Sequence, residues 1–195
     1  MKNFSLFIIS IFFIGFLYIT VKAIEISNKT KISTSDGVYT SYTSNSKDIK
    51  QKAYELTKNC KSNLCKTQAL LDFTSNIPYS TNLFQKNSPQ TTIQQNFGDC
   101  DDKSNLLISM LHTLNIEAYF VLVPKHIFVI VKLKDSRLAK KRGLWVNKEK
   151  YYILESTAKN SKVAYPLRYR LNQIDAIVEP FQNKKIDIDK LEFSI

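Results

Sequence analysis

Hydrophobic residues recur at helical spacing in two neighbouring segments of the chain. Ala53, Leu56 and Cys60 follow this period within residues 49–60, and a second set continues it within residues 66–75. Ile77-Pro78 should end the second helix, because the residue before a proline disfavours the α region. We therefore expect two helices joined by a short turn.

A third helix is expected to begin at Gly98-Asp99, since Cys100 shares one helical face with three leucines, Leu107, Leu111 and Leu114. The segment before it, residues 80–97, is polar and contains Pro89. That composition predicts a long surface loop, and long ordered loops are often functional.

Residues typical of β-strands dominate the second half of the chain. The runs cover residues 116–123, 127–133 and 145–154, the last as a strand pair or hairpin, with shorter pieces at 176–179 and 191–195. Helices followed by antiparallel strands predict an α+β fold in which N-terminal helices pack on an antiparallel sheet.

The N-terminus has a different pattern. Residues 4–21 carry no charge, and 18 apolar residues are just long enough for a transmembrane helix. A cleaved signal peptide is the alternative, because residues 21–23 resemble a cleavage site, but the apolar run is long for one. We expect an anchor or signal peptide at 1–24, a Ser/Thr-rich tether at 25–46 and one domain at 47–195.

The formal net charge of +11 raises the possibility of an anionic partner. The lysines are scattered, however, and the one dense basic run, residues 137–142, falls between two strand-like segments. A solvated hairpin loop explains that run, so we expect no nucleic acid partner. A basic nucleic-acid or lipid-surface binder would rest on net charge alone.

The three cysteines divide into a close pair and a single residue. Cys60 and Cys65 are five positions apart, which favours a local disulfide with Cys100 as a free thiol. A disulfide would place the domain outside the cytosol, in the periplasm or at the cell surface, or secreted if the N-terminus is cleaved. A zinc site and two unpaired buried cysteines are the alternatives.

Cys100 is placed to be a nucleophile. A helix N-terminus stabilises a thiolate, and its free N–H groups can hold an oxyanion. His112 is twelve residues further along the same helix, roughly 18 Å away, so it cannot be the base. His126 opens a strand and can reach the helix start, and Glu155, at the end of another strand, can accept from its second nitrogen.

These segments together resemble the transglutaminase-like superfamily. The family's nucleophile helix and the strand after it resemble residues 98–107 (GDCDDKSNLL) and 114–118 (LNIEA) of this chain. Its histidine strand resembles residues 126–129 (HIFV), and its acid-bearing segment resembles residues 152–157 (YILEST). The resemblance covers roughly residues 49–158. It implies a papain-like core with Cys100 as nucleophile, His126 as base and Glu155 as orienting acid, where Asp is commoner in the family.

The resemblance implies acyl-enzyme chemistry and leaves open whether water or an amine resolves the thioester. Our leading expectation is action on peptide or protein amides, with hydrolysis favoured over transfer to an amine. A non-catalytic binding or assembly module with the same fold is the alternative. We expect no cofactor and no metal, since Asp99, Asp101 and Asp102 chiefly complement the helix dipole. Gln94 and Gln95 are candidates for the second oxyanion donor. A membrane partner is expected through the N-terminal helix, and the oligomeric state is left open.

Overall fold

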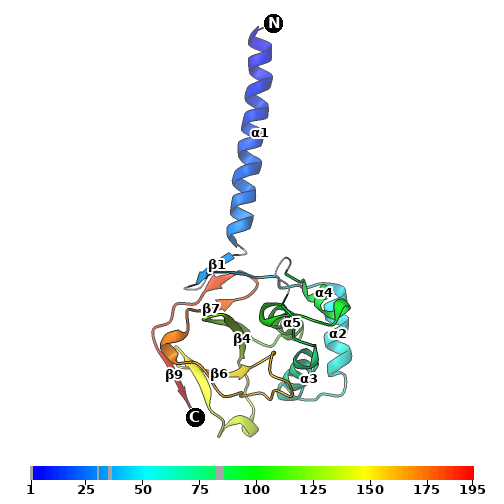
Figure 1. The fold of residues 1–195 in the computed structure, drawn as a ribbon, viewed down its shortest axis with the longest axis vertical. Helices are drawn as coiled ribbons and strands as arrows, with labels where there is room; N and C mark the ends of the chain where they lie inside the picture. The colour runs from blue at the N-terminus through cyan, green and yellow to red at the C-terminus, as the bar shows by residue number, and fades with distance from the viewer. Residues whose placement is uncertain (1, 30, 35–36, 82–85) are drawn as a thin grey trace.

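The computed structural model describes residues 2–29, 31–34, 37–81 and 86–195. The first element, α1 (Lys2–Lys29), extends away from the body that the other elements form (Figure 1). The membrane span expected at residues 4–21 lies within α1, and Met1 lies outside the described residues. That span is not confirmed: none of the described helices combines the length and apolar character needed to cross a membrane.

The segment expected to be a tether differs from the prediction. It contains an antiparallel hairpin, β1 (Lys31–Thr34) and β2 (Gly37–Thr40), in which Tyr39 is buried. Beyond it, the Ser41 hydroxyl donates to the Pro180 carbonyl at 3.1 Å and the Tyr42 N–H donates to Asn105 Oδ1 at 3.0 Å. The polar residues that suggested a solvated arm therefore bind the domain instead.

Helices α2 (Lys47–Thr57) and α3 (Asn63–Asn76) confirm the two helices expected from the hydrophobic period. The expected loop at 80–97 is partly helical, because α4 (Pro89–Gln95) lies within it, whereas residues 82–85 lie outside the described part. The Ser88 hydroxyl accepts from the Thr91 N–H at 3.1 Å, and Pro89 occupies the first helical turn. Proline is favoured at that position, so Pro89 starts a helix here.

The strands form one antiparallel sheet after α5 (Cys100–Thr113). Its order among the described residues is β8-β7-β3-β4-β6-β5-β9. The bounds are β3 (Ala118–Val123), β4 (His126–Val131), β5 (Gly143–Val146), β6 (Glu149–Leu154), β7 (Ala176–Glu179), β8 (Lys184–Lys185) and β9 (Leu191–Ser194). The α+β prediction is confirmed, and the basic run lies between β4 and β5.

Alternation along the strands gives the sheet two covered faces. Ile127 and Val129 belong to the core beneath the helices, together with residues of α2, α3 and α5. Phe128 and Ile130 belong to a second core on the opposite face. The segment between β6 and β7 covers that second face with partly buried Tyr165, Leu167 and Tyr169, among others. A β-strand buried on both faces explains why β4 is continuously hydrophobic.

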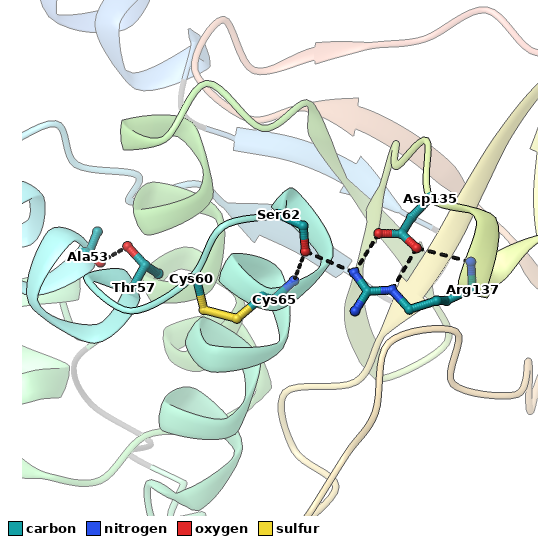
Figure 2. Close-up of a disulfide and its surroundings, with 7 residues drawn as sticks. All are labelled: Ala53, Thr57, Cys60, Ser62, Cys65, Asp135 and Arg137. Carbon is teal, nitrogen blue, oxygen red and sulfur yellow. Dashed lines mark hydrogen bonds and ion pairs between the residues drawn. A yellow bond between two sulfur atoms is a disulfide. The ribbon is translucent and has the colours of Figure 1, made fainter.

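The predicted disulfide is confirmed between Cys60 and Cys65, whose Cα atoms are 5.4 Å apart (Figure 2). It joins the turn that follows α2 to the first turn of α3. Ser62 caps α3 by accepting from the Cys65 N–H at 3.2 Å, and Arg137 also donates to the Ser62 hydroxyl. The turn between the two helices is therefore fixed by a covalent bond and a cap, and the zinc and free-thiol alternatives are wrong.

Candidate active site

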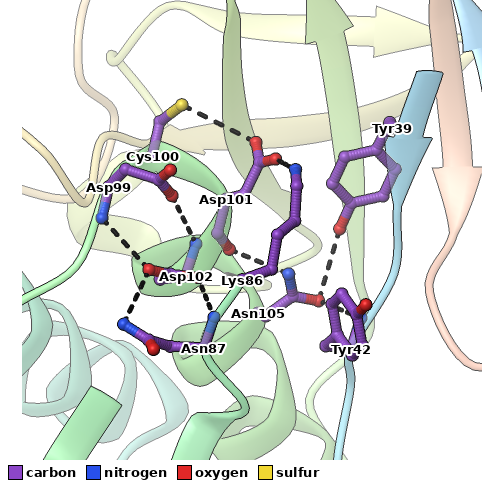
Figure 3. Close-up of polar contacts among 9 residues, drawn as sticks. All are labelled: Tyr39, Tyr42, Lys86, Asn87, Asp99, Cys100, Asp101, Asp102 and Asn105. Carbon is purple, nitrogen blue, oxygen red and sulfur yellow. Dashed lines mark hydrogen bonds and ion pairs between the residues drawn. The ribbon is translucent and has the colours of Figure 1, made fainter. Parts of the chain in front are cut away.

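The start of α5 is set by a reciprocal cap. Asp99 Oδ1 accepts from the Asp102 N–H at 3.1 Å, and Asp102 Oδ2 accepts from the Asp99 N–H at 3.4 Å (Figure 3). Asp102 is buried and also accepts from Asn87, from its backbone N–H at 2.9 Å and its amide at 3.1 Å. Cys100 is consequently the first residue of a firmly capped helix, with first-turn N–H groups free of intrahelical partners.

Gly98 allows the chain to approach α5 closely. A Cβ atom there would lie 2.8 Å from the Cβ of Asp102 and 3.2 Å from Cγ2 of Thr92. The Gly98 N–H donates to the Pro78 carbonyl, and the Ser80 N–H donates to the Gly98 carbonyl, both at 3.2 Å. These contacts tie the nucleophile helix to the segment that follows α3.

His126 and Glu155 meet as the sequence predicted. His126 is the first residue of β4, directly after a two-residue turn that pairs it with Val123. Glu155 follows the last residue of β6, which pairs with β4. His126 Nε2 lies 2.8 Å from Glu155 Oε2, and both side chains are mostly buried. This hydrogen bond leaves Nδ1 of the imidazole for another partner.

Cys100 lies next to the same strand. The backbone of Ile127, one residue after His126, hydrogen-bonds the Cys100 sulfur. Cys100 and His126 both line a hollow of about 250 Å³, together with Tyr39 from the N-terminal hairpin and Lys125. The structure therefore brings the three predicted residues to one place, at the junction of α5, β4 and β6.

The thiol itself is not in the state that the helix position suggested. Burial, followed by the carboxylates of Asp101 and Asp99, raises the pKa of Cys100 to about 12. Its Sγ donates to Asp101 Oδ1 at 3.6 Å, and Asp101 also pairs with Lys86 (Figure 3). The acids of the first turn favour the protonated thiol, so a base must remove the proton when the thiol reacts.

Glu155 is held as a carboxylate. Burial acts to raise its pKa, but hydrogen bonds and charge from His126 and hydrogen bonds from Thr157 outweigh burial, and the pKa is lowered. Glu155 Oε1 accepts from the Thr157 N–H at 3.0 Å and from the Thr157 hydroxyl at 2.6 Å. Both carboxylate oxygens are thus fixed, which orients the imidazole ring.

Two buried polar residues of α5 escaped the sequence analysis. Lys103 is 1% exposed and donates to the carbonyls of Ser75, at 3.4 Å, and Ile77, at 2.8 Å, at the end of α3. Ser104 lies 3.3 Å from the hydroxyl of Ser156, next to Glu155. Their spacing from Cys100, three and four residues, could have indicated their place beside the site, because residues at that spacing share a helix face.

The other histidine and the two glutamines considered in the sequence analysis lie outside the hollow at Cys100. His112 stacks on Phe181, with ring centroids 3.8 Å apart, at the far end of α5, which agrees with its exclusion as the base. The oxyanion candidates Gln94 and Gln95 are both exposed on α4, and neither lines the hollow at Cys100. The N–H groups of Cys100 and Asp101, which have no intrahelical acceptor at the start of α5, are candidate oxyanion donors.

The acidic first turn could also attract a cation. Ligand atoms of Asp99, Cys100 and Asp101 lie within 4.8 Å of one another. The Lys86 ammonium already pairs with Asp101, and a divalent cation would have to displace it. We therefore assign an ion pair at this position.

Comparison with known proteins gives a family match. The model of the transglutaminase-like superfamily matches residues 50–161, a range that includes Cys100, His126 and Glu155. No curated protein matches the chain.

Two solved structures are similar to this chain at low identity. One, named "putative cysteine protease" from Cytophaga hutchinsonii, is 18% identical over 75% of this chain and 50% of that chain, with a TM-score of 0.45. The other, named "putative protease" from Parabacteroides distasonis, is 14% identical over 72% of this chain and 27% of that chain, with a TM-score of 0.47. The chain thus spans half or less of their length.

Proposed function

The chain belongs to the transglutaminase-like superfamily, and from that premise we propose that it is a thiol enzyme that hydrolyses amide bonds of peptides or proteins through an acyl-enzyme at Cys100. One observation supports this most directly. His126 is hydrogen-bonded to Glu155 at 2.8 Å through Nε2, while it lines the same hollow as the Cys100 thiol. This arrangement supports the roles of nucleophile for Cys100, base for His126 and orienting acid for Glu155.

The proposed reaction has two steps. Cys100 Sγ attacks the amide carbon while His126 Nδ1 takes the thiol proton, so an S–C bond forms and the carbonyl oxygen becomes an oxyanion. The free N–H groups at the start of α5 stabilise that oxyanion. The C–N bond then breaks as His126 returns the proton to the leaving nitrogen. Water then attacks the thioester carbon while His126 takes its proton, so a C–O bond forms. The S–C bond breaks, His126 returns the proton to Cys100 Sγ, and the acid product leaves.

Glu155 would act during both proton transfers. When His126 becomes an imidazolium ion, the carboxylate 2.8 Å away stabilises the positive charge and keeps the ring aligned. Because the pKa of Cys100 is raised, the thiol rests protonated and this general-base route is favoured over a preformed thiolate–imidazolium pair.

Hydrolysis is the proposed outcome rather than transfer to an amine. The hollow at Cys100 is lined by the charged residues Asp99, Asp101 and Lys125, which favour a hydrated site. Water would then be the nucleophile most available to the thioester.

We place the domain outside the cytoplasm, and the Cys60–Cys65 disulfide supports this, because such bonds persist in oxidising compartments. Attachment to a membrane through the N-terminal segment, and the choice between an anchor and a signal peptide, stay predictions.

A non-catalytic binding module is the second candidate. The observation that favours it is the thiol proton, which is directed to Asp101 in a site where acids raise the pKa of Cys100. Such a module would keep the fold and bind peptides without turning them over.

The deciding experiment offers the enzyme a library of glutamine-containing and other peptides, with and without the fluorescent amine dansylcadaverine. Mass spectrometry distinguishes hydrolysis products from amine adducts. We expect hydrolysis by the wild-type protein and none by Cys100→Ala or His126→Ala. His112→Ala is the matched control, since it removes the other histidine, and it should retain activity.

Equal product formation by wild type and Cys100→Ala would contradict the enzymatic proposal. Adducts in excess of hydrolysis would keep the thiol chemistry and replace water by an amine as the acceptor.

A further inference from the structure

A second hollow lies beside the candidate active site and is not used by the chemistry described above. Its volume is about 330 Å³, within the range of roughly 300–1,000 Å³ typical of ligand pockets. His126 and Glu155 form one wall of it. The two hollows therefore share His126, with the thiol in one and the acid in the other.

This second hollow lies on the sheet face opposite the helices. Its floor includes Phe128 and Ile153, which belong to the second core. The segment that follows β6 contributes Tyr165, Leu167 and Tyr169 to its lining. Five residues of the lining, 165–169, therefore lie beyond residue 161, where the family match ends.

The lining combines aromatic and apolar side chains with polar groups. The Tyr169 ring is nearly parallel to the rings of His126 and Phe128, with centroids 6.1 Å and 6.3 Å away. Pro166, Leu167 and Ala158 add apolar surface around them. A flat apolar group entering here would contact several rings at once, next to the imidazole.

One cation stands at this hollow. Arg168 lines it and lies over the Tyr165 ring, with its guanidinium carbon 5.1 Å from the centroid. Glu155, the other charged residue of the lining, is already bound by His126 and Thr157. Within the described residues Arg168 forms no ion pair, so its charge is available to a ligand carboxylate.

We infer that this hollow, which we term the aromatic subsite, binds a large apolar or aromatic side chain of the substrate peptide that neighbours an acidic residue. The inference rests on the proposed function for the identity of the ligand as substrate. The aromatic lining selects the apolar side chain, and Arg168 selects the carboxylate beside it.

Binding can be measured without turnover by using the Cys100→Ala protein. The probes are fluorescein-labelled decapeptides of alanine and glycine with one Phe-Asp pair, placed at successive positions, and their Ser-Asp and Phe-Lys counterparts. Fluorescence anisotropy gives the Kd of each peptide. We expect Phe→Ser to weaken binding at least about tenfold, and Asp→Lys to weaken it about threefold to fivefold.

Variants in the segment after β6 locate the effect. Arg168→Glu should reverse the preference for Asp over Lys, whereas Arg170→Glu, two residues away and outside the lining, should keep it. Leu167→Ala should reduce the preference for Phe, and Leu171→Ala, which packs on the same core without lining the subsite, should not. Thermal melts of all four confirm folding.

Absence of a preference for Phe-Asp, or equal effects of Arg168→Glu and Arg170→Glu, would overturn the inference. Failure of the proposed function is a separate result. If the wild-type protein turns over none of these peptides while Cys100→Ala shows the expected preferences, the subsite stands and the enzymatic proposal falls.

Discussion

Replacing Asp101 with Asn should lower the pKa of the Cys100 thiol and speed its alkylation near neutral pH. Asp101 Oδ1 accepts from Sγ at 3.6 Å, and its negative charge opposes formation of the thiolate. Asn keeps the size of the side chain and removes the charge. Asp101 is neither nucleophile nor base in the proposed mechanism, so the change tests the electrostatics of the thiol directly.

The magnitude follows from the distance. Two unit charges 3.6 Å apart interact by about 1.2 kcal/mol at the dielectric constant of water and about 4.6 kcal/mol at an effective value of 20. The Asp101 side chain is 18% exposed, which places it between these limits, and Lys86 offsets part of its charge. At about 1.36 kcal/mol per unit, we expect the pKa to fall by about 1 to 2 units.

The assay measures the rate of iodoacetamide alkylation of Cys100 by mass spectrometry at fixed pH values between about 7 and 10. A lower pKa raises the thiolate fraction but lowers the reactivity of each thiolate, with a Brønsted coefficient of about 0.4–0.5. The net gain for Asp101→Asn is therefore about threefold to fifteenfold at pH well below the pKa. Circular dichroism checks that the fold persists.

Lys86→Met provides the opposite perturbation. It removes the cation that pairs with Asp101 and leaves the carboxylate uncompensated beside Sγ, so alkylation should slow. An unchanged or slower rate in folded Asp101→Asn would refute the assignment of Asp101 as the charge that holds the thiol protonated.

Three further predictions concern the rest of the domain. Glu155→Gln should reduce kcat/KM by about 10²–10⁴-fold with the fold intact, whereas Glu155→Asp should be partly active. If both variants have the kcat/KM of the wild type, another group orients His126. Cys60→Ser should lower the free energy of unfolding in urea by about 2 kcal/mol and leave Cys100 alkylation unchanged. Burial lowers the pKa of Lys103 from 10.5 to about 8. Between these pH values the unfolded chain binds more protons than the folded protein, so the free energy of unfolding of the wild type should rise with pH. Lys103→Met should lack that rise in urea titrations at pH 8 to 10.5.

Short-range features of this protein could be predicted from the sequence. The start of α5 depends on Asp99 and Asp102, three residues apart, and the disulfide joins Cys60 to Cys65. Strand and helix periods were sufficient for the α+β class. The set Cys100, His126 and Glu155 followed from chain order, strand ends and family resemblance, because each lies at the end of an element where side chains can converge.

Long-range contacts decided what the sequence left open. Strands β1 and β2 lie against the domain because Tyr39, Ser41 and Tyr42, in β2 and just after it, hydrogen-bond Asn105 and Pro180, more than 60 residues away. Lysine is usually a surface residue. Lys103 can lie in the core because carbonyls at the end of α3 accept hydrogen bonds from its side chain.

The protonation of the Cys100 thiol also depends on long-range packing. A helix N-terminus alone predicts a stabilised thiolate, but burial and the carboxylate of Asp101 reverse the direction of the pKa shift at Cys100. The aromatic subsite likewise exists only because the segment after β6 folds back over Phe128. Caps, turns and periods act within a few residues, whereas burial and charge at a site depend on how distant segments pack, and the tertiary structure alone fixes that packing.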